Sequence, residues 1–455
     1  MPRPRRLLAL LAVLLLAIGV AACGDDDDGD GDDGDGSEVT GVEALPEKTC
    51  GEVEYGGEGE PQALIASDLP LQGDSAERSA QMNDAIRQEL DNQGWRTGPT
   101  NVAFQACDDS IEETGEWDEA TCKSNAEAYA ANPDLIGVIG TYNSGCAAVM
   151  IPILNQAPDG GVAMVSPGNT AICLTQRAAT CEAGQPESLY PSGTRNYARV
   201  VPNDAFQGAG LASFAHKQGV RKPFVLYAAD DPTSKGQADT FIGGAFFHDT
   251  PVVGIETWDP DAADYTKLME KVRGAGADGL VLAGLLDQNG AQLIQDKVAV
   301  LGPNEGDGAA VQLFAPDGFA QQATIDTAGP DAAGMFVSVP GRLPEKLTGD
   351  GKAFVDELQA DLGDMPVELF APYSAQAAQV LLSAMAPDPT RAATVEALTQ
   401  VEVDKGITGV FEITPTGDPS LGPIDISVAR DTFELAGEEN PSPPQVAFAR
   451  GERGG

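Results

Sequence analysis

Cysteine and histidine are the residue types in this chain most able to do chemistry, and both are scarce. The 455 residues include seven cysteines and two histidines, His216 and His248. No C-x-x-C pair occurs, so the cysteines lack the spacing of a typical zinc site. Two histidines leave little material for acid–base catalysis, and we interpret both as packing or helix-surface residues. We expect no metal, no cofactor and no catalytic residue.

Catalytic sequence motifs are also missing. The chain has no Walker A sequence, no G-x-S-x-G elbow, no S-x-x-K and no H-E-x-x-H. Ser144 lies in "YNSGC", where the first glycine of the elbow is absent. The pattern favours a binding protein over an enzyme.

Cys23 differs from the other cysteines because of the segment before it. Arginines at positions 3, 5 and 6 precede an apolar run over residues 7–20 and two alanines. This is the order of a secretory signal, and the run is short for a membrane span. "GVAAC" resembles the lipobox of bacterial lipoproteins. We expect residues 1–22 to be a signal peptide and Cys23 to carry lipid at the outer face of the cell membrane. An uncleaved anchor helix is the alternative.

The segment after Cys23 is acidic and low in complexity. Eight aspartates fall between positions 25 and 35, interrupted only by glycine. Such a composition buries too little apolar surface to offset the entropy of ordering, so residues 23–59 are interpreted as an extended tether. Asp26, Asp28, Asp30 and Gly31 fit the start of a calcium-binding loop, but its twelfth position is Ser37 instead of glutamate. We favour the tether.

Charge and cysteine number narrow the class of protein. The formal net charge is −43, which argues against nucleic acid as a partner. Without Cys23, six cysteines remain, an even number that predicts three disulfides in an exported chain. They are Cys50, Cys107, Cys122, Cys146, Cys173 and Cys181. Cys173 and Cys181 are eight residues apart in a loop, and we expect them to pair.

The elements that must position any site alternate between strand and helix. Apolar runs at 63–67, 101–106, 135–140 and 162–166 predict buried strands, with helices at 75–92, 118–131 and 146–156. The pattern restarts with strands at 197–201, 223–228, 279–284, 311–315 and 334–340, and helices at 204–218, 349–362, 371–386 and 391–400. This alternation indicates βαβ units around parallel sheets, in two domains.

Several stretches together resemble the leucine/isoleucine/valine-binding proteins of bacterial ABC importers. They are "LPLQG" (69–73), "VIGTYNSGCA" (138–147), "MVSPGNT" (164–170), "NDAFQG" (203–208), "APDG" (315–318) and "AAGMFVSVPGR" (332–342). The resemblance implies the type I periplasmic binding protein fold: two doubly wound α/β lobes with parallel sheets, joined by three crossing strands. It places the crossings near 197–202, 334–340 and 409–414.

The resemblance also implies boundaries for the lobes. Lobe 1 is expected at 60–199 and 338–410, lobe 2 at 200–337 and 411–435, and a polar tail at 436–455. The family function implies a monomer that closes around a small ligand, an amino acid of the branched-chain type by default, and delivers it to membrane permease subunits. A receptor that senses an amide or other small solute without transport is the alternative.

The family's ligand contacts carry over to five residues. Ser144 begins a helix after a strand, and Asn169 and Thr170 follow "SPG"; these three are expected to hold a carboxylate. Asp317 matches the acidic residue that pairs with the ligand's ammonium. Leu285 and Leu286 stand where the family often has aromatic residues. The resemblance therefore implies that a cation–π or hydroxyl contact to the ligand is lost there.

The resemblance suggests one disulfide as well. Cys107 and Cys146 follow neighbouring strands, where the family often has a bridge, and this leaves Cys50 with Cys122. Cys107 with Cys122 is the alternative.

Overall fold

The computed structural model of this protein describes residues 39–112 and 115–451. The signal peptide and residues 23–38, the first part of the expected tether, lie outside these residues, so those predictions remain expectations. The rest of the expected tether, residues 39–59, is not an extended linker but packs on the folded domain, where Leu45 and Cys50 are buried. Within the described part of the chain, no helix is long and apolar enough to cross a membrane.

The first sheet contains six strands, most of them apolar runs recognised in the sequence. They are β1 (Ala63–Leu69), β2 (Arg96–Thr97), β3 (Thr100–Asp108), β4 (Leu135–Gly140), β5 (Ala163–Ser166) and β6 (Tyr197–Arg199). Their order is β2-β3-β1-β4-β5-β6, and neighbours are parallel except for β2 with β3. β4, "LIGVIG", is buried along its whole length, as expected for a strand covered on both faces.

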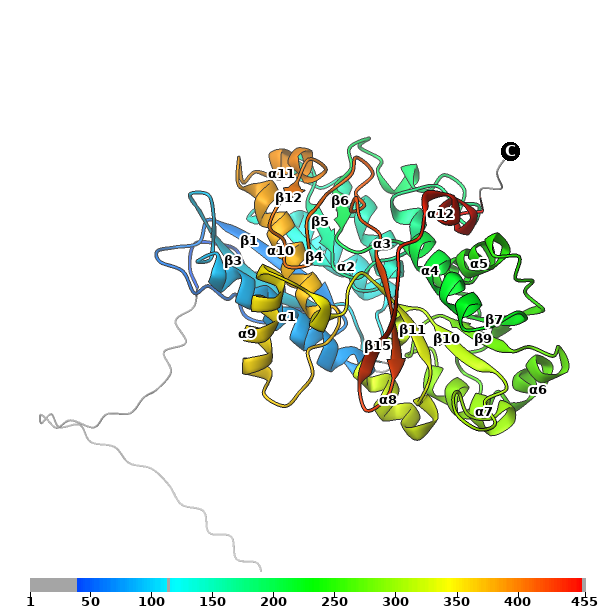
Figure 1. Ribbon diagram of the computed structural model, residues 1–455. Helices are drawn as coiled ribbons and strands as arrows, with labels where there is room; N and C mark the ends of the chain where they lie inside the picture. Colours follow the sequence, from blue (N-terminus) through cyan, green and yellow to red (C-terminus); the bar gives the residue numbers. More distant parts are fainter. Residues whose placement is uncertain (1–38, 113–114, 452–455) are drawn as a thin grey trace, which may run out of the picture. The chain divides into compact units, whose positions relative to one another are not determined.

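Helices cover both faces of this sheet because side chains alternate along each strand. Ile65 and Leu69 belong to a cluster with residues of α1 (Ala76–Asn92) and α10 (Ala371–Met385). Leu64 and Ala66 pack on the other face with α2 (Glu119–Ala131) and α3 (Ser144–Asn155). α9 (Asp350–Leu362) and α11 (Arg391–Leu398) lie against α10 (Figure 1). These elements form the first lobe.

The second sheet has seven strands. They are β7 (Pro223–Ala228), β8 (Gly254–Trp258), β9 (Gly279–Ala283), β10 (Gln312–Ala315), β11 (Phe336–Pro340), β14 (Ile424–Ala429) and β15 (Phe433–Glu439). The order is β15-β14-β11-β10-β9-β7-β8; β14 pairs antiparallel with both β11 and β15, and the other neighbours are parallel. The two-lobed α/β prediction is thus confirmed, with sheets that are mixed and mostly parallel.

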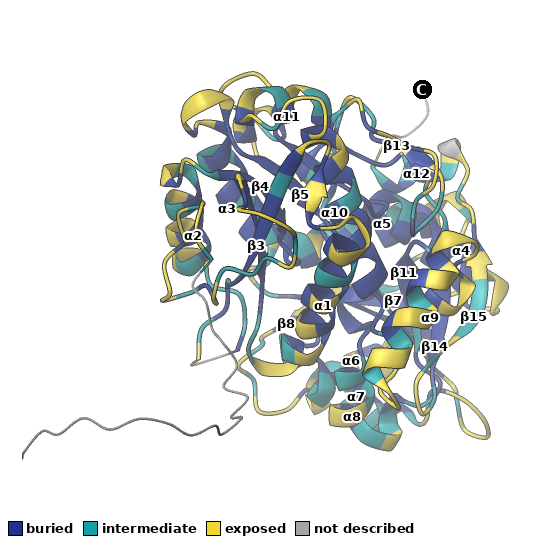
Figure 2. Ribbon diagram, turned by 90° about the vertical axis from the view of Figure 1, so that its left-hand side faces the viewer, coloured by how far each residue is buried: buried dark blue, intermediate teal, exposed yellow. Residues whose placement is uncertain are grey.

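Two groups of helices sandwich the second sheet. α4 (Asp204–Lys217) and α5 (Pro232–Phe247) pack on one face with Val225, Val281 and Phe314. α6 (Thr266–Gly274), α7 (Gly290–Leu301) and α8 (Gln322–Ala328) lie on the other. Figure 2 shows buried strands beneath helices whose outer faces are exposed.

Three segments connect the lobes. The chain passes from β6 to α4, returns after β11, and crosses again between β13 (Phe411–Glu412) and β14. β13 pairs with β12 (Glu402–Val403). Single 3₁₀ turns occur at Gly73–Ser75, Pro158–Gly160, Ile172–Leu174, Glu187–Leu189, Asp317–Phe319, Gly329–Ala332 and Pro344–Lys346.

The segment predicted to be a polar tail is more ordered than expected. β15 runs to Glu439, and α12 (Pro443–Ala449) follows, capped by Ser442 and Gln445. Val446 and Ala449 are buried in a cluster with residues of α4. Phe448 of the same helix contacts Phe246 and Phe247 of α5. Apolar side chains thus dock this short helix, although the surrounding sequence is polar and rich in proline.

The disulfides differ from two of the predicted pairs. Cys173 bonds Cys181 as expected, but Cys50 bonds Cys107 and Cys122 bonds Cys146. The predicted pairs Cys107–Cys146 and Cys50–Cys122 are therefore wrong. The chain before β1 runs antiparallel along β3, which places Cys50 opposite Cys107 with 3.9 Å between their Cα atoms. The neighbouring helices α2 and α3 bring Cys122 to Cys146.

Candidate functional site

The strand order singles out one position in each sheet. In the first sheet, β3 and β4 lie on opposite sides of β1, so the order reverses between β1 and β4. In the second sheet, β8 and β9 flank β7, so it reverses between β7 and β9. Open α/β sheets bind ligands beyond the carboxyl ends of the strands at such switch points. The loops after β1, β4 and β9 are therefore the first places to look.

Polar side chains from these loops meet between the lobes. We name Ser75, Arg78, Tyr142, Asp287, Asp317 and Gln321 the interlobe cluster. Ser75 and Arg78 follow β1, and Tyr142 follows β4; Asp287 follows β9, and Asp317 and Gln321 follow β10. The cluster joins the lobes directly, since the Ser75 hydroxyl donates to Asp287 Oδ2 at 3.2 Å and Arg78 donates to Gln321 Oε1 at 2.5 Å.

Arg78 lies at the centre of this cluster and is only 2% exposed. Besides Gln321, its guanidinium donates to Ser75 Oγ at 2.7 Å and lies 3.7 Å above the centre of the Tyr142 ring. Its Nε has no hydrogen-bond partner among the described residues. The guanidinium is thus held by both lobes, and one donor remains free.

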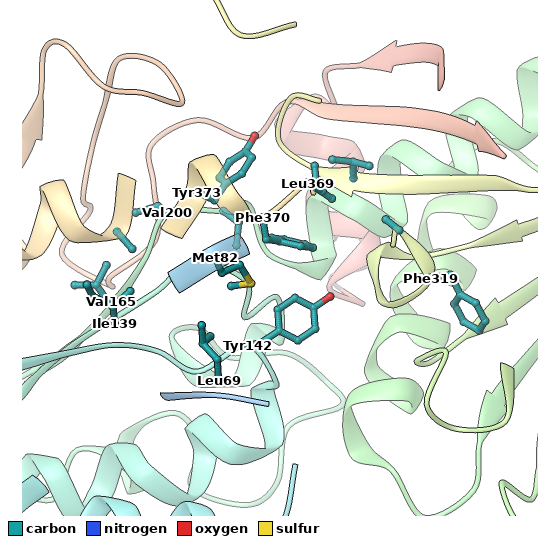
Figure 3. Packing of buried hydrophobic residues seen from close by; sticks show 14 of the residues in the cluster. Leu69, Met82, Ile139, Tyr142, Val165, Val200, Phe319, Leu369, Phe370 and Tyr373 are labelled. Carbon is teal, nitrogen blue, oxygen red and sulfur yellow. The ribbon is translucent and has the colours of Figure 1, made fainter. Parts of the chain in front are cut away.

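Tyr142 provides the aromatic surface under Arg78. Its ring meets Phe370 edge to face at 5.1 Å, and Figure 3 shows its hydroxyl pointing away from Leu69. Burial raises the pKa of the Tyr142 hydroxyl, so the group is a neutral phenol at physiological pH. Within the described ranges, this hydroxyl has no hydrogen-bond partner. Tyr142 therefore offers a buried donor beside a buried cation.

The second lobe contributes carboxylates. Burial raises the pKa of Asp287, although the Arg78 charge opposes this shift, and Oδ1 of Asp287 has no partner in the described chain. Asp317 Oδ1 accepts from Gln207 Nε2 at 2.6 Å, and burial raises its pKa to about 6. Asp204, at the start of α4, has a pKa raised to about 7 by burial and by the nearby Asp317 charge. Opposite charges thus face each other across the lobes.

The predicted contact residues lie at the carboxyl edges of the two sheets. Ser144 opens α3, and its Oγ accepts from the Ala171 N–H at 3.2 Å. Asn169 is fully buried: its amide donates to Tyr142 O at 2.8 Å, and its Oδ1 accepts from the Tyr197 hydroxyl. The Thr170 carbonyl accepts from the Asp204 N–H at 2.8 Å. These hydrogen bonds within the protein stabilise the loops at this edge. The contact of the three residues with a ligand remains a prediction.

Leu285 packs against Gly318, the residue that follows Asp317. Leu285 is half-buried in the turn after β9, and the Leu285 chain lies so close to Gly318 that a Cβ there would clash. This close approach brings the turn after β9 against the turn after β10. It holds Asp287 and Asp317 on one edge of the second lobe.

Arg78, Tyr142 and Asp287 were not singled out from the sequence. Arg78 lies three residues inside a helix, and no local motif marks it. It is, however, the only lysine or arginine between Lys48 and Arg87. Tyr142 lies in the stretch 138–147, two residues before Ser144, and Asp287 directly follows Leu285 and Leu286. The sequence signal that could have identified these residues is their position after a predicted strand at a switch point of the sheet.

Two further features lie beside the interlobe cluster. A groove of about 520 Å³ runs between α9 and β15, and its lining includes Ala320 and Glu368. The other feature is a buried group of Asp109, Cys122 and Cys146 with the spacing of metal ligands. Because the two cysteines are joined in a disulfide, they offer no thiolate to a metal.

Comparisons with known proteins identify the family and the fold. A family model described as "Periplasmic binding protein" matches residues 109–421. Leucine-specific-binding proteins of Salmonella typhimurium and Salmonella typhi are 24% identical over 252 residues, or 55% of this chain. The match spans 61% of the length of these relatives.

Solved structures show the same fold. A leucine binding protein from Thermotoga maritima has a TM-score of 0.69 and 18% identity, covering 83% of this chain and 99% of that one. A branched-chain amino acid transporter substrate binding protein from Streptococcus pneumoniae, in complex with isoleucine, has a TM-score of 0.67 and 16% identity, with 83% and 99% covered. A solute binding protein from R. palustris, in complex with benzoate, has a TM-score of 0.66 and 16% identity, with 83% and 96% covered.

Proposed function

Because this chain belongs to the periplasmic binding protein family, we propose that it is the solute-binding protein of an ABC importer and that its ligand is an amino acid. One observation carries the proposal: the interlobe cluster presents a buried cation from lobe 1 and carboxylates from lobe 2. An amino acid carries the complementary pair of charges. Bound there, it links the lobes and favours their closure.

The contacts expected from the family frame the same ligand. Ser144 and Thr170 lie at the carboxyl edge of the first sheet. Asn169 links their two loops through the hydrogen bond from its amide to Tyr142 O. Asp317 supplies a carboxylate for the ammonium, and Leu285 supplies apolar surface. Leucine-type ligands are the first to test, since the curated relatives are leucine-specific-binding proteins.

The cellular setting follows from the start of the sequence. We propose that Cys23 becomes the lipidated N-terminus and that the Asp/Gly segment holds the binding domain away from the membrane. Two or more acyl chains give stable attachment, whereas one is marginal. Membrane permease subunits are the proposed partners, and they would recognise the closed lobes.

A thermal-shift screen of the purified protein tests the ligand class. The panel contains the twenty L-amino acids, small amides and aromatic acids such as benzoate. A ligand at a hundredfold excess over its Kd stabilises the folded state by about 2.7 kcal/mol. We expect at least one amino acid to raise the melting temperature. Shifts by amides or benzoate alone would contradict the amino-acid assignment.

A further inference from the structure

We propose that the ligand's carboxylate is held by Arg78 Nε and the Tyr142 hydroxyl, and that its ammonium is held by Asp287 Oδ1 together with Asp317. This inference rests on the proposed function and names the atoms that select the ligand. It adds the loop–helix junction after β1 to the carboxylate contacts expected from the family at the start of α3.

The first support is the hydrogen-bond state of three buried atoms. Arg78 Nε, Tyr142 Oη and Asp287 Oδ1 all lack a partner in the described chain. Arg78 and Tyr142 are 2% and 5% exposed. Leaving a buried polar group unpaired costs about 1–3 kcal/mol, so folded proteins rarely tolerate several in one place without a function. Two donors on lobe 1 and one acceptor on lobe 2 match the two ends of an amino acid.

The second support is the contrast with the predicted carboxylate site. Ser144 Oγ already accepts a backbone N–H, and the Asn169 amide donates to Tyr142 O and lies 3.4 Å from Thr141 Oγ1. Arg199 donates to the Asn169 carbonyl at 2.9 Å. The Asn169 side chain is therefore satisfied inside the protein and Ser144 keeps only its hydroxyl donor, whereas around Arg78 two donors and one acceptor have no partner in the described chain.

The third support is position in the fold. Arg78 and Tyr142 come from the loops after β1 and β4, which meet at the switch point of the first sheet. Asp287 comes from the loop after β9, at the switch point of the second. Ser75 bonds both Arg78 and Asp287, so the two charged ends of the site are fixed relative to each other.

The charges also restrict the ligand. Asp109, Asp287, Asp317 and Glu368 all interact electrostatically with Arg78, so one cation faces four carboxyl groups. A ligand with a carboxylate but no ammonium would add another negative charge next to these carboxyl groups. The site therefore fits a zwitterion and rejects a simple acid such as benzoate.

Calorimetry with the best amino acid from the panel, its primary amide and its desamino acid tests the assignment. For leucine these are leucinamide and 4-methylpentanoate. Arg78→Met and Asp287→Asn should each weaken the amino acid by about 30-fold or more, as for a broken buried charge pair. Tyr142→Phe should weaken it by about 3- to 10-fold. The amide has no carboxylate, so Arg78→Met should change its affinity by less than about threefold. The desamino acid has no ammonium, so Asp287→Asn should likewise change its affinity by less than about threefold.

Matched controls separate binding from folding. Arg87→Met lies on the same helix but pairs with Glu54 and Asp84, and it should leave the affinity unchanged. Tyr142→Phe and Asp287→Asn keep the shape of the side chain, so they also test the proposal if Arg78→Met fails to fold. If both variants bind the amino acid within threefold of the wild-type affinity, this inference is overturned but the proposed function is not. Failure of every amino acid to bind wild type overturns the proposed function as well.

Discussion

The buried ion pair between Arg199 and Asp418 connects two of the three crossing segments. Arg199 ends β6, and Asp418 lies in the crossing between β13 and β14. Arg199 Nε donates to Asp418 Oδ1 at 2.9 Å, and the two side chains are 0% and 8% exposed. Burial by itself raises the pKa of Asp418, but the Arg199 charge and hydrogen bonds from Gln176, Thr416 and Thr175 outweigh burial and lower it. The pair is thus fully ionised at neutral pH.

Asp418→Asn should destabilise the protein by about 3–5 kcal/mol, because it leaves the Arg199 charge buried without its counterion. Unfolding entropy is about 2 cal/mol/K per residue, so over the roughly 410 described residues the melting temperature should fall by about 3–6 °C. A carboxylate with a lowered pKa contributes stability above its unfolded pKa and loses it as pH falls. The difference between variant and wild type should therefore persist from pH 5 to 8 and shrink below about pH 3.8.

Urea unfolding followed by tryptophan fluorescence measures this effect, since Trp95 and Trp258 are buried in different lobes. Asp356→Asn is the control, because its pair with Lys352 is exposed and worth little. Arg199→Met combined with Asp418→Leu should recover part of the loss, since neither charge is then left alone. A destabilisation by Asp418→Asn of less than about 1 kcal/mol would refute the reasoning.

Four further predictions concern the ligand, one disulfide and the lipid anchor. Asp317→Asn should weaken an amino-acid ligand by about 2–5 kcal/mol in calorimetry, and undiminished affinity would exclude its ammonium role. Because burial raises the pKa of Asp317 to about 6, with Asp204, Gln207 and Arg78 facing it, affinity should be constant above pH 7 and fall by up to about tenfold per pH unit below pH 6. Cys122→Ala with Cys146→Ala should lower the free energy of unfolding by about 2–4 kcal/mol; free thiols at both positions in the native protein would contradict the bond. Cys23→Ser should leave the protein soluble or unprocessed, and unchanged membrane attachment with normal processing would disprove lipidation.

The fold was predictable where burial leaves a continuous apolar run. "LIGVIG" was assigned to 135–140, which are the bounds of β4, and the helix expected at 204–218 is α4, Asp204–Lys217. The edge elements were missed. β8, "GIETW", alternates between half-buried and exposed positions, and β15, "FELAGEE", is buried only at Glu439. Strands of this kind resemble loops in sequence because pairing with a neighbouring strand, not a local pattern, stabilises them.

The candidate site was predictable only in part, for a related reason. Local sequence and resemblance placed Ser144, Asn169 and Asp317 at the ends of strands. Arg78 acquires its meaning from Gln321 and Asp287, which are more than 200 residues away in the chain. The pairing of Cys50 with Cys107 likewise depends on an N-terminal segment lying along β3. Contacts between distant segments have no signature in a single sequence.

The contrast between scaffold and interlobe cluster suggests how binding energy is used. The Arg199 guanidinium donates to Asp418, to the Asn169 carbonyl and to Thr175, so the protein itself supplies its partners at this crossing. Around Arg78, three buried polar atoms have no partner in the described chain, and together they disfavour contact between the lobes by several kcal/mol, at about 1–3 kcal/mol each. A zwitterion that pairs with all three removes this penalty only when the lobes meet. Its affinity for the closed arrangement then exceeds that for the open one, which is the thermodynamic requirement for a ligand to drive closure. A ligand that satisfies one end alone leaves part of the penalty in place, so selection and closure depend on the same atoms.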